Sequence, residues 1–139
     1  MRSFQNYIDE KKVKKMSPDL AEADSLIQQA QDRVTDLLSL PLNEKNSSFR
    51  FESAYEALRE TIQAFMSREG FKPYSHEAII AYAYENELLN EGEAINLDRY
   101  REKRNDINYR GQKITVDEAK MIISFTKDLI AKLVINFKK

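Results

Sequence analysis

The sequence predicts an all-α fold, an up-and-down bundle of five or six helices. Apolar residues recur at three- and four-residue steps along most of the chain, and no segment sustains an alternation of apolar and polar residues. Only 3 glycines and 3 prolines occur among the 139 residues, so few positions break regular structure. The length suits one domain, residues 1–139, with a single hydrophobic core.

Two helices are expected in the N-terminal third. The polar segment covering about the first 15 residues is expected to form a short helix. The second helix is expected to begin with Ser17 as N-cap and Pro18 at its first position, and to end at Pro41. Its predicted apolar stripe consists of Leu20, Ala23, Ile27, Ala30, Val34, Leu37 and Leu38.

The middle of the chain is expected to form two further helices. The first lies within residues 49–70 and stops at Gly70. Its predicted apolar stripe consists of Phe51, Ala54, Tyr55, Leu58, Ile62 and Phe65. The next helix is expected to start after Ser75, a natural N-cap residue, and to stop near Gly92.

The last two expected helices flank Gly111. One covers residues 96–109 and is closed by Gly111, which suits a C-terminal cap. The other begins at Thr115, which has the spacing of a capping box with Glu118. Its apolar stripe continues to Phe137.

Composition narrows the class of function. Lys and Arg total 22 against 23 Asp and Glu, so net charge provides no general attraction to nucleic acid or to an anionic membrane. The chain has no cysteine and one histidine, which argues against disulfides, cysteine nucleophiles and transition-metal sites; no metal or cofactor is expected. Without a signal-like apolar run or a membrane-length segment, a cytoplasmic location is expected.

The segment RNDINYRG, residues 104–111, is the strongest candidate site. On a helical wheel Leu97, Tyr100 and Ile107 share one arc, and Arg104 falls inside it with Asn108 at its border. Burying an unpaired guanidinium is costly, so Arg104 must reach solvent, pair with a carboxylate, or bind an anion such as phosphate. Tyr109 lies about 140° from Arg104 on a regular helix.

Basic residues gather around Arg104. Candidate contacts to nucleic acid or nucleotide are Arg101, Lys103, Asn108 and Arg110. The alternative is that these residues form an ordinary solvated helix face. His76, at a predicted helix start, is expected to have a structural role, and would serve catalysis only if the fold brought it to Arg104.

Three segments, 13–34, 71–85 and 99–133, together resemble the HEPN superfamily of small all-α prokaryotic domains. The resemblance implies a symmetric homodimer and metal-independent RNA cleavage in a toxin–antitoxin or defence setting. HEPN ribonucleases carry an arginine, usually followed by a polar residue, four to six residues before a histidine. Arg104 and Asn105 match the first two positions, but Tyr109 stands at the third, and a phenol is a poor base near neutral pH.

Two functions are therefore open at the level of sequence. The first is a HEPN-like protein that binds RNA or nucleotide at a dimer cleft, with Arg104, Asn105 and Tyr109 as the candidate catalytic residues. The second is a non-catalytic module that partners a minimal nucleotidyltransferase, an antitoxin or another protein. A third hypothesis is that the protein is a helical bundle whose RNDINYRG segment contributes only to dimer packing.

Overall fold

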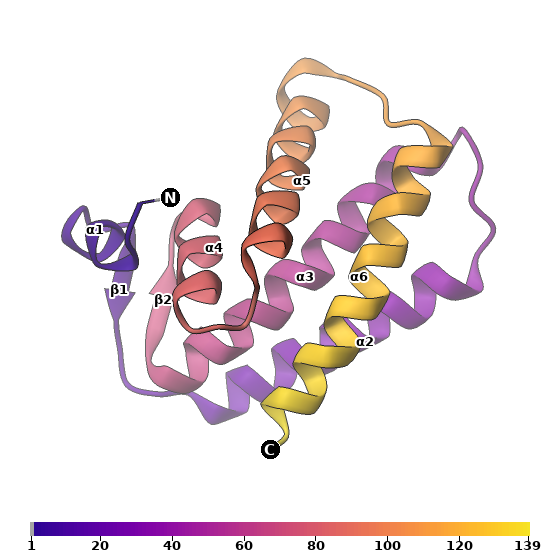
Figure 1. Ribbon diagram of the computed structural model, residues 1–139. Helices are drawn as coiled ribbons and strands as arrows, with labels where there is room; N and C mark the ends of the chain where they lie inside the picture. The colour runs from indigo at the N-terminus through magenta and orange to yellow at the C-terminus, as the bar shows by residue number, and fades with distance from the viewer. Residues whose placement is uncertain (1) are drawn as a thin grey trace.

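The computed structural model describes residues 2–139; Met1, which the predicted domain also includes, lies outside the described residues. Six helices and two short strands follow one another along the chain (Figure 1). Their bounds are α1 (Phe4–Asp9), β1 (Val13–Lys15), α2 (Leu20–Ser39), α3 (Ser47–Glu69), β2 (Phe71–Pro73), α4 (His76–Glu85), α5 (Glu91–Arg110) and α6 (Val116–Phe137). The prediction of a mostly helical bundle is confirmed.

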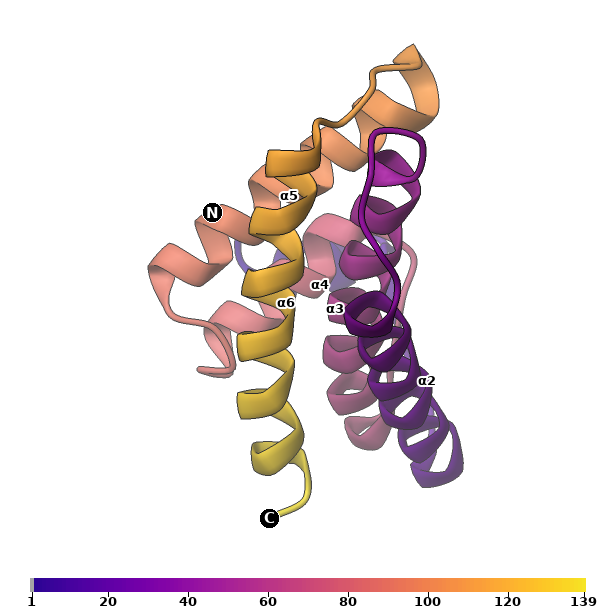
Figure 2. The same ribbon diagram turned by 90° about the vertical axis from the view of Figure 1, so that its right-hand side faces the viewer.

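Helix α3 is the centre of the bundle. It packs along α2 on one side and along α6 on the other, and α4 and α5 lie beside each other across its remaining face (Figures 1 and 2). The predicted stripe of α3 is buried throughout, from Phe51 to Phe65. Burial of such apolar surface, at about 25 cal/mol per Å², is the main force holding the helices together.

The predicted stripe of α2 is only partly correct. Ala23, Ile27, Ala30 and Leu37 are buried, as expected. Val34 is partly buried against the core. Leu20 is 62% exposed and Leu38 52% exposed, and both lie at the ends of the helix, which runs from Leu20 to Ser39. The spacing of apolar residues placed both leucines on the predicted stripe, but spacing does not show where contact with α3 stops.

The small β-sheet was not predicted. Strands β1 and β2 pair antiparallel, with Val13 opposite Pro73 and Lys15 opposite Phe71. Three residues are too few to produce a visible alternation, which explains why the sequence pattern missed them. The expected helix over about the first 15 residues is therefore wrong in extent, since α1 ends at Asp9.

Three helix boundaries also differ from prediction: the start of α2, the end of α4 and the start of α5. Asp19, not Ser17, caps α2, because its side chain accepts a hydrogen bond from the backbone N–H of Glu22 at 2.9 Å. Helix α4 ends at Glu85, well before Gly92. Asn90 then caps α5 through a capping box with Glu93, so α5 begins at Glu91 and not at the predicted residue 96. Gly92 lies in the first turn of α5 and does not end a helix.

The other predicted caps are confirmed. Gly70 and Gly111 adopt left-handed conformations with φ of 89° and 66° at the ends of α3 and α5. Ser75 caps α4, and Thr115 and Glu118 form the capping box of α6. Within residues 2–139, no helix combines the length and apolar character that crossing a bilayer requires.

Candidate functional site

Arg104 lies on the face of α5 that is turned toward α3. Its side chain is 24% exposed, and its Nη2 lies 3.7 Å from Oε1 of Glu56 on α3. The guanidinium also lies 6.0 Å from the centre of the Tyr55 ring, within the range of a cation–π contact. Arg104 is thus neither deeply buried nor fully solvated, but is held at a helix–helix boundary that solvent can reach.

Asn108, one turn further along α5, supports this position. With its side-chain amide oriented to satisfy both neighbours, the nitrogen donates to Glu52 and the oxygen accepts from Nε of Arg104 at 3.3 Å. A separation of 3.7 Å to Glu56 exceeds ordinary hydrogen-bond length. Among residues 2–139, no hydrogen bond from either terminal nitrogen of Arg104 is found, so these donors are available to an anion.

Glu56 is the carboxylate shared by two arginines. Arg59 donates to it from Nε at 2.9 Å and from Nη2 at 2.7 Å, and Arg104 lies at the other oxygen. Burial acts to raise the pKa of Glu56, but the hydrogen bond and charge of Arg59 outweigh burial and lower it. Glu56 is therefore ionised at neutral pH, and it neutralises only part of the positive charge beside it.

His76, at the start of α4, is brought into the same neighbourhood. Its Nδ1 shares a hydrogen bond with the Tyr55 hydroxyl at 2.9 Å, and the two rings are stacked with centroids 5.7 Å apart. Partial burial, followed by the positive charges of Arg104 and Arg59, lowers the pKa of His76. The imidazole is consequently neutral at pH 7, and no bond to Nε2 is found among the described residues.

Arg101, one turn before Arg104, is a third cation at this boundary. It donates to Asp98 at 2.9 Å and lies 3.8 Å from Glu77, the residue that follows His76. Its charge, with that of Arg104, also acts on the buried Tyr55 hydroxyl. We call these six residues the arginine–histidine cluster: Tyr55, Glu56, Arg59, His76, Arg101 and Arg104.

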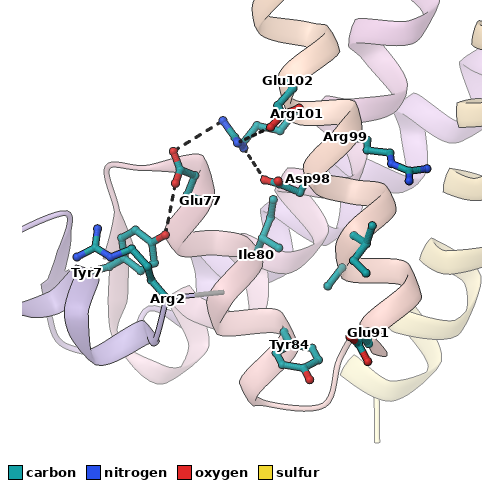
Figure 3. A pocket seen from close by; sticks show the side chains of 12 residues that line it. Arg2, Tyr7, Glu77, Ile80, Tyr84, Glu91, Asp98, Arg99, Arg101 and Glu102 are labelled. Atoms are coloured by element: carbon teal, nitrogen blue, oxygen red, sulfur yellow. Dashed lines mark hydrogen bonds and ion pairs between the residues drawn. The ribbon is translucent and has the colours of Figure 1, made fainter.

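A pocket of about 750 Å³ adjoins the cluster, between the N-terminal segment, α4 and α5. Figure 3 shows Arg101 and Glu77 at one end of it, Tyr84 and Glu91 at the other, and Tyr7 along one side. The Tyr7 hydroxyl donates to Glu77 at 3.4 Å. We call this the α4–α5 pocket; Arg101 and Glu77 connect it to the arginine–histidine cluster.

The remaining sequence-predicted residues lie outside the cluster. Tyr109 is 81% exposed, and no hydrogen bond or ring contact joins it to Arg104 among residues 2–139, since α5 stays helical to Arg110. Arg110 lies 3.8 Å from Asp106 on the outer face, and Lys103 pairs with Glu118 of α6. Asn105 is partly exposed beside Arg104. Within a single chain, Asn108 and Arg101 therefore lie beside Arg104, and Tyr109 does not.

Sequence reasoning missed the α3 half of the cluster. Glu52, Glu56 and Arg59 form a polar line beside the apolar stripe of α3, at steps of four and three residues. That spacing was visible, but nothing local indicated that α5 would cover the line. His76 was considered only on the condition that the fold brought it to Arg104, and the fold does so through Tyr55.

The chemistry of the cluster is that of an anion site with a neutral imidazole. Among residues 2–139, no three His, Asp or Glu side chains gather in a way that would hold a metal ion. Two guanidinium groups, those of Arg59 and Arg104, share the single carboxylate of Glu56, which favours a phosphate-bearing ligand there. A neutral histidine next to them is able to accept a proton near pH 7.

Comparison with protein-family models, curated proteins and solved structures found no match to this chain. The HEPN resemblance of segments 13–34, 71–85 and 99–133 therefore stays a prediction, and the proposal for function depends on the geometry of the described residues.

Proposed function

We propose that the protein binds RNA or nucleotide through phosphate contacts at the arginine–histidine cluster, as a HEPN-like domain would. The observation that carries the proposal is the state of Arg104. Its terminal donors face a carboxylate 3.7 Å away that Arg59 already holds more closely. A phosphate oxygen placed beside Arg104 would satisfy the donors that Glu56 leaves free.

The balance of charge at Glu56 supports a ligand rather than a closed structural network, because Arg104 and Arg59 share this one carboxylate. Arg101, at the edge of the pocket, is paired with three carboxylates: Asp98, Glu77 and Glu102. All three arginine side chains keep some exposure, at 24%, 24% and 15%. Arginine's planar fork suits the two-point binding of phosphate oxygens that a nucleic-acid backbone offers.

The decisive experiment compares Arg104→Ala with the intact protein in binding to a fluorescein-labelled single-stranded RNA. We expect affinity to fall roughly tenfold or more, since a charge-assisted contact is lost. Arg50→Ala is the matched control, because Arg50 is 15% exposed and makes one ion pair, at 3.5 Å, with Asp36 on the other side of α3. Equal affinity for all three proteins would overturn the proposal.

The same labelled RNA also serves to measure cleavage: it is incubated with the protein in the presence of EDTA, and the products are separated on a gel. His76 is the chain's single histidine and is neutral beside the arginines, so we expect metal-independent cleavage, if it occurs, to require it. His76→Asn keeps an acceptor for the Tyr55 hydroxyl while removing the imidazole. Cleavage that survives in His76→Asn and is lost in Tyr109→Phe would instead assign the chemistry to Tyr109.

A second candidate function is that of an interaction module for a nucleotidyltransferase, an antitoxin or another protein. It is favoured by exposed aromatic residues near the cluster end of the bundle: Phe49 is 72% exposed and Tyr109 81% exposed. Aromatic side chains are enriched at protein interfaces. Retention of a defined partner by the intact protein, lost in Phe49→Ser but kept in Arg104→Ala, would support this second function.

A further inference from the structure

The α4–α5 pocket has an apolar floor and an exposed tyrosine, which a site for phosphate alone does not need. Its floor is apolar: Ile80 and Ala94 are buried there, and Ile95 is 46% exposed. Tyr84, 40% exposed, closes the end away from Arg101 (Figure 3). A volume of about 750 Å³ lies within the range of small-molecule sites, roughly 300–1,000 Å³.

The rim of the pocket provides hydrogen-bond acceptors. Glu91 has no ion-pair partner among residues 2–139, and Glu77 and Asp98 each have an oxygen turned toward Arg101 and the cavity (Figure 3). A purely apolar ligand that covered Glu91 would leave its carboxylate desolvated and unpaired, which is costly. A flat ligand with N–H donors along one edge satisfies both the floor and the rim.

The position of the α4–α5 pocket beside the arginine–histidine cluster indicates which class of flat ligand fits it. Arg101 lines the pocket, and Arg104 follows it by one turn, about 5 Å along the helix axis. A phosphate held between these arginines therefore lies at the mouth of the pocket, with the next group of the same molecule directed inside. Unpaired bases combine a π-face for stacking with polar edges for hydrogen bonding.

We propose that the α4–α5 pocket binds the base of a nucleotide whose phosphate is held by the arginine–histidine cluster. This inference rests on the proposed function and makes it specific: the ligand is single-stranded, and its base carries an exocyclic amino group. Tyr84 stacks on the base, and the rim carboxylates accept from the amino group. Uracil, which has no amino group, fits the rim less well, and a duplex cannot present an unpaired base.

The test measures fluorescence anisotropy with three labelled probes: an adenine octaribonucleotide, a uracil octaribonucleotide and an abasic ribose-phosphate chain of equal length. We expect the adenine probe to bind most tightly and the abasic chain least. Tyr84→Ala is expected to weaken the adenine probe by roughly 5- to 150-fold, the range found for loss of base–aromatic stacking. Its effect on the abasic chain is expected to be below twofold.

Matched controls separate the pocket from general surface effects. Tyr74→Ala removes a tyrosine that is 60% exposed and lies outside the pocket, so it is expected to bind all probes normally. Ile95→Asp places a charge on the floor and is compared with Ile135→Asp, on the exposed face of α6. Far-UV circular dichroism establishes that each variant is folded.

The outcomes distinguish the two levels of proposal. If the adenine probe binds in an Arg104-dependent way, but Tyr84→Ala and Ile95→Asp bind as tightly as their controls, the base pocket is overturned while phosphate binding stands. Equal affinity for adenine and abasic probes overturns it in the same way. If no probe binds, or if binding is independent of Arg104, both the base pocket and the proposed function are overturned.

Discussion

Arg104 and His76 meet at Tyr55, a residue that the apolar pattern of α3 placed in the core. The ring of Tyr55 packs inside the bundle, while its hydroxyl reaches His76 and its face lies under Arg104. Burial raises the pKa of this hydroxyl, so Tyr55 is a neutral hydrogen-bonding group at any physiological pH. One side chain thus packs in the core and positions the site.

The pKa of His76 tests this arrangement at the level of a single residue. Because the charge of Arg104 helps to lower that pKa, Arg104→Met is expected to raise it toward 6.5. Titration of the His76 ring followed by NMR measures the change. Lys103→Met is the matched control, since Lys103 pairs with Glu118 on the other side of α5; an equal shift in both variants would contradict the placement of Arg104.

The same shift has a consequence for stability. The unfolded chain binds a proton at His76 near pH 6.5, whereas the folded protein binds it only at lower pH. The contribution of His76 to the free energy of unfolding is therefore fully present above about pH 7. This contribution is lost as the pH falls from about 6.5 through the pKa of the folded state. Carboxylates with a lowered pKa, such as Glu56, also contribute to stability, but their contribution is lost only at pH values below about 4.5.

At the scale of elements, two glycines close helices with the same left-handed conformation but in different surroundings. A Cβ at Gly70 would overlap the backbone carbonyl oxygen of Met16, where the chain passes from β1 to α2. A Cβ at Gly111 would meet no atom within 4 Å. Gly70 therefore serves both the turn and the close approach of two backbones, and Gly111 serves the turn alone.

Substitution by alanine separates these two roles. We expect either variant to lose about 1–2 kcal/mol from the left-handed backbone, and Gly70→Ala to lose a further ~1–3 kcal/mol from overlap with Met16. Urea denaturation monitored by circular dichroism gives both values. Gly92→Ala, in the first turn of α5, is the control and is expected to be neutral or slightly stabilising. Equal losses at positions 70 and 111 would refute the packing argument.

At the scale of the whole molecule, a net charge of −1 leaves local contacts to supply any attraction to RNA. With three arginines each meeting a phosphate, the slope of log affinity against log salt is expected to be about −2 for a single strand. Binding measured at NaCl concentrations from about 50 to about 200 mM checks this slope. A slope steeper than about −5 would indicate a much wider basic surface than the arginine–histidine cluster.

The predicted homodimer is also a property of the whole molecule. Exposed apolar side chains on α6, among them Met121 and Ile135, offer surface for a second copy. Two-fold dimers are the commonest assembly of soluble oligomers. Light scattering at working concentration is expected to give twice the 16.3 kDa mass of one chain. A species of 16.3 kDa alone would exclude the dimer under those conditions.

Sequence by itself determined the helices and most of their ends. Periodic apolar residues define the buried faces of α3 and α6, and the caps at Gly70, Ser75, Gly111 and Thr115 depend on local chemistry. Such features follow from neighbours within a few residues, which is why a pattern reveals them. The three-residue strands escaped prediction because their pairing joins residues about 60 positions apart.

The site was decided only by tertiary structure. Sequence singled out Arg104 as a charge on an apolar arc, but it grouped Arg104 with Tyr109, its neighbour in the chain. In the fold α5 stays helical to Arg110, and Tyr109 faces solvent. Glu56 and Tyr55 approach Arg104 from α3, and His76 bonds to Tyr55 from α4. Periodicity reports which side of a helix is covered, whereas packing of one helix on another determines which side chains meet there.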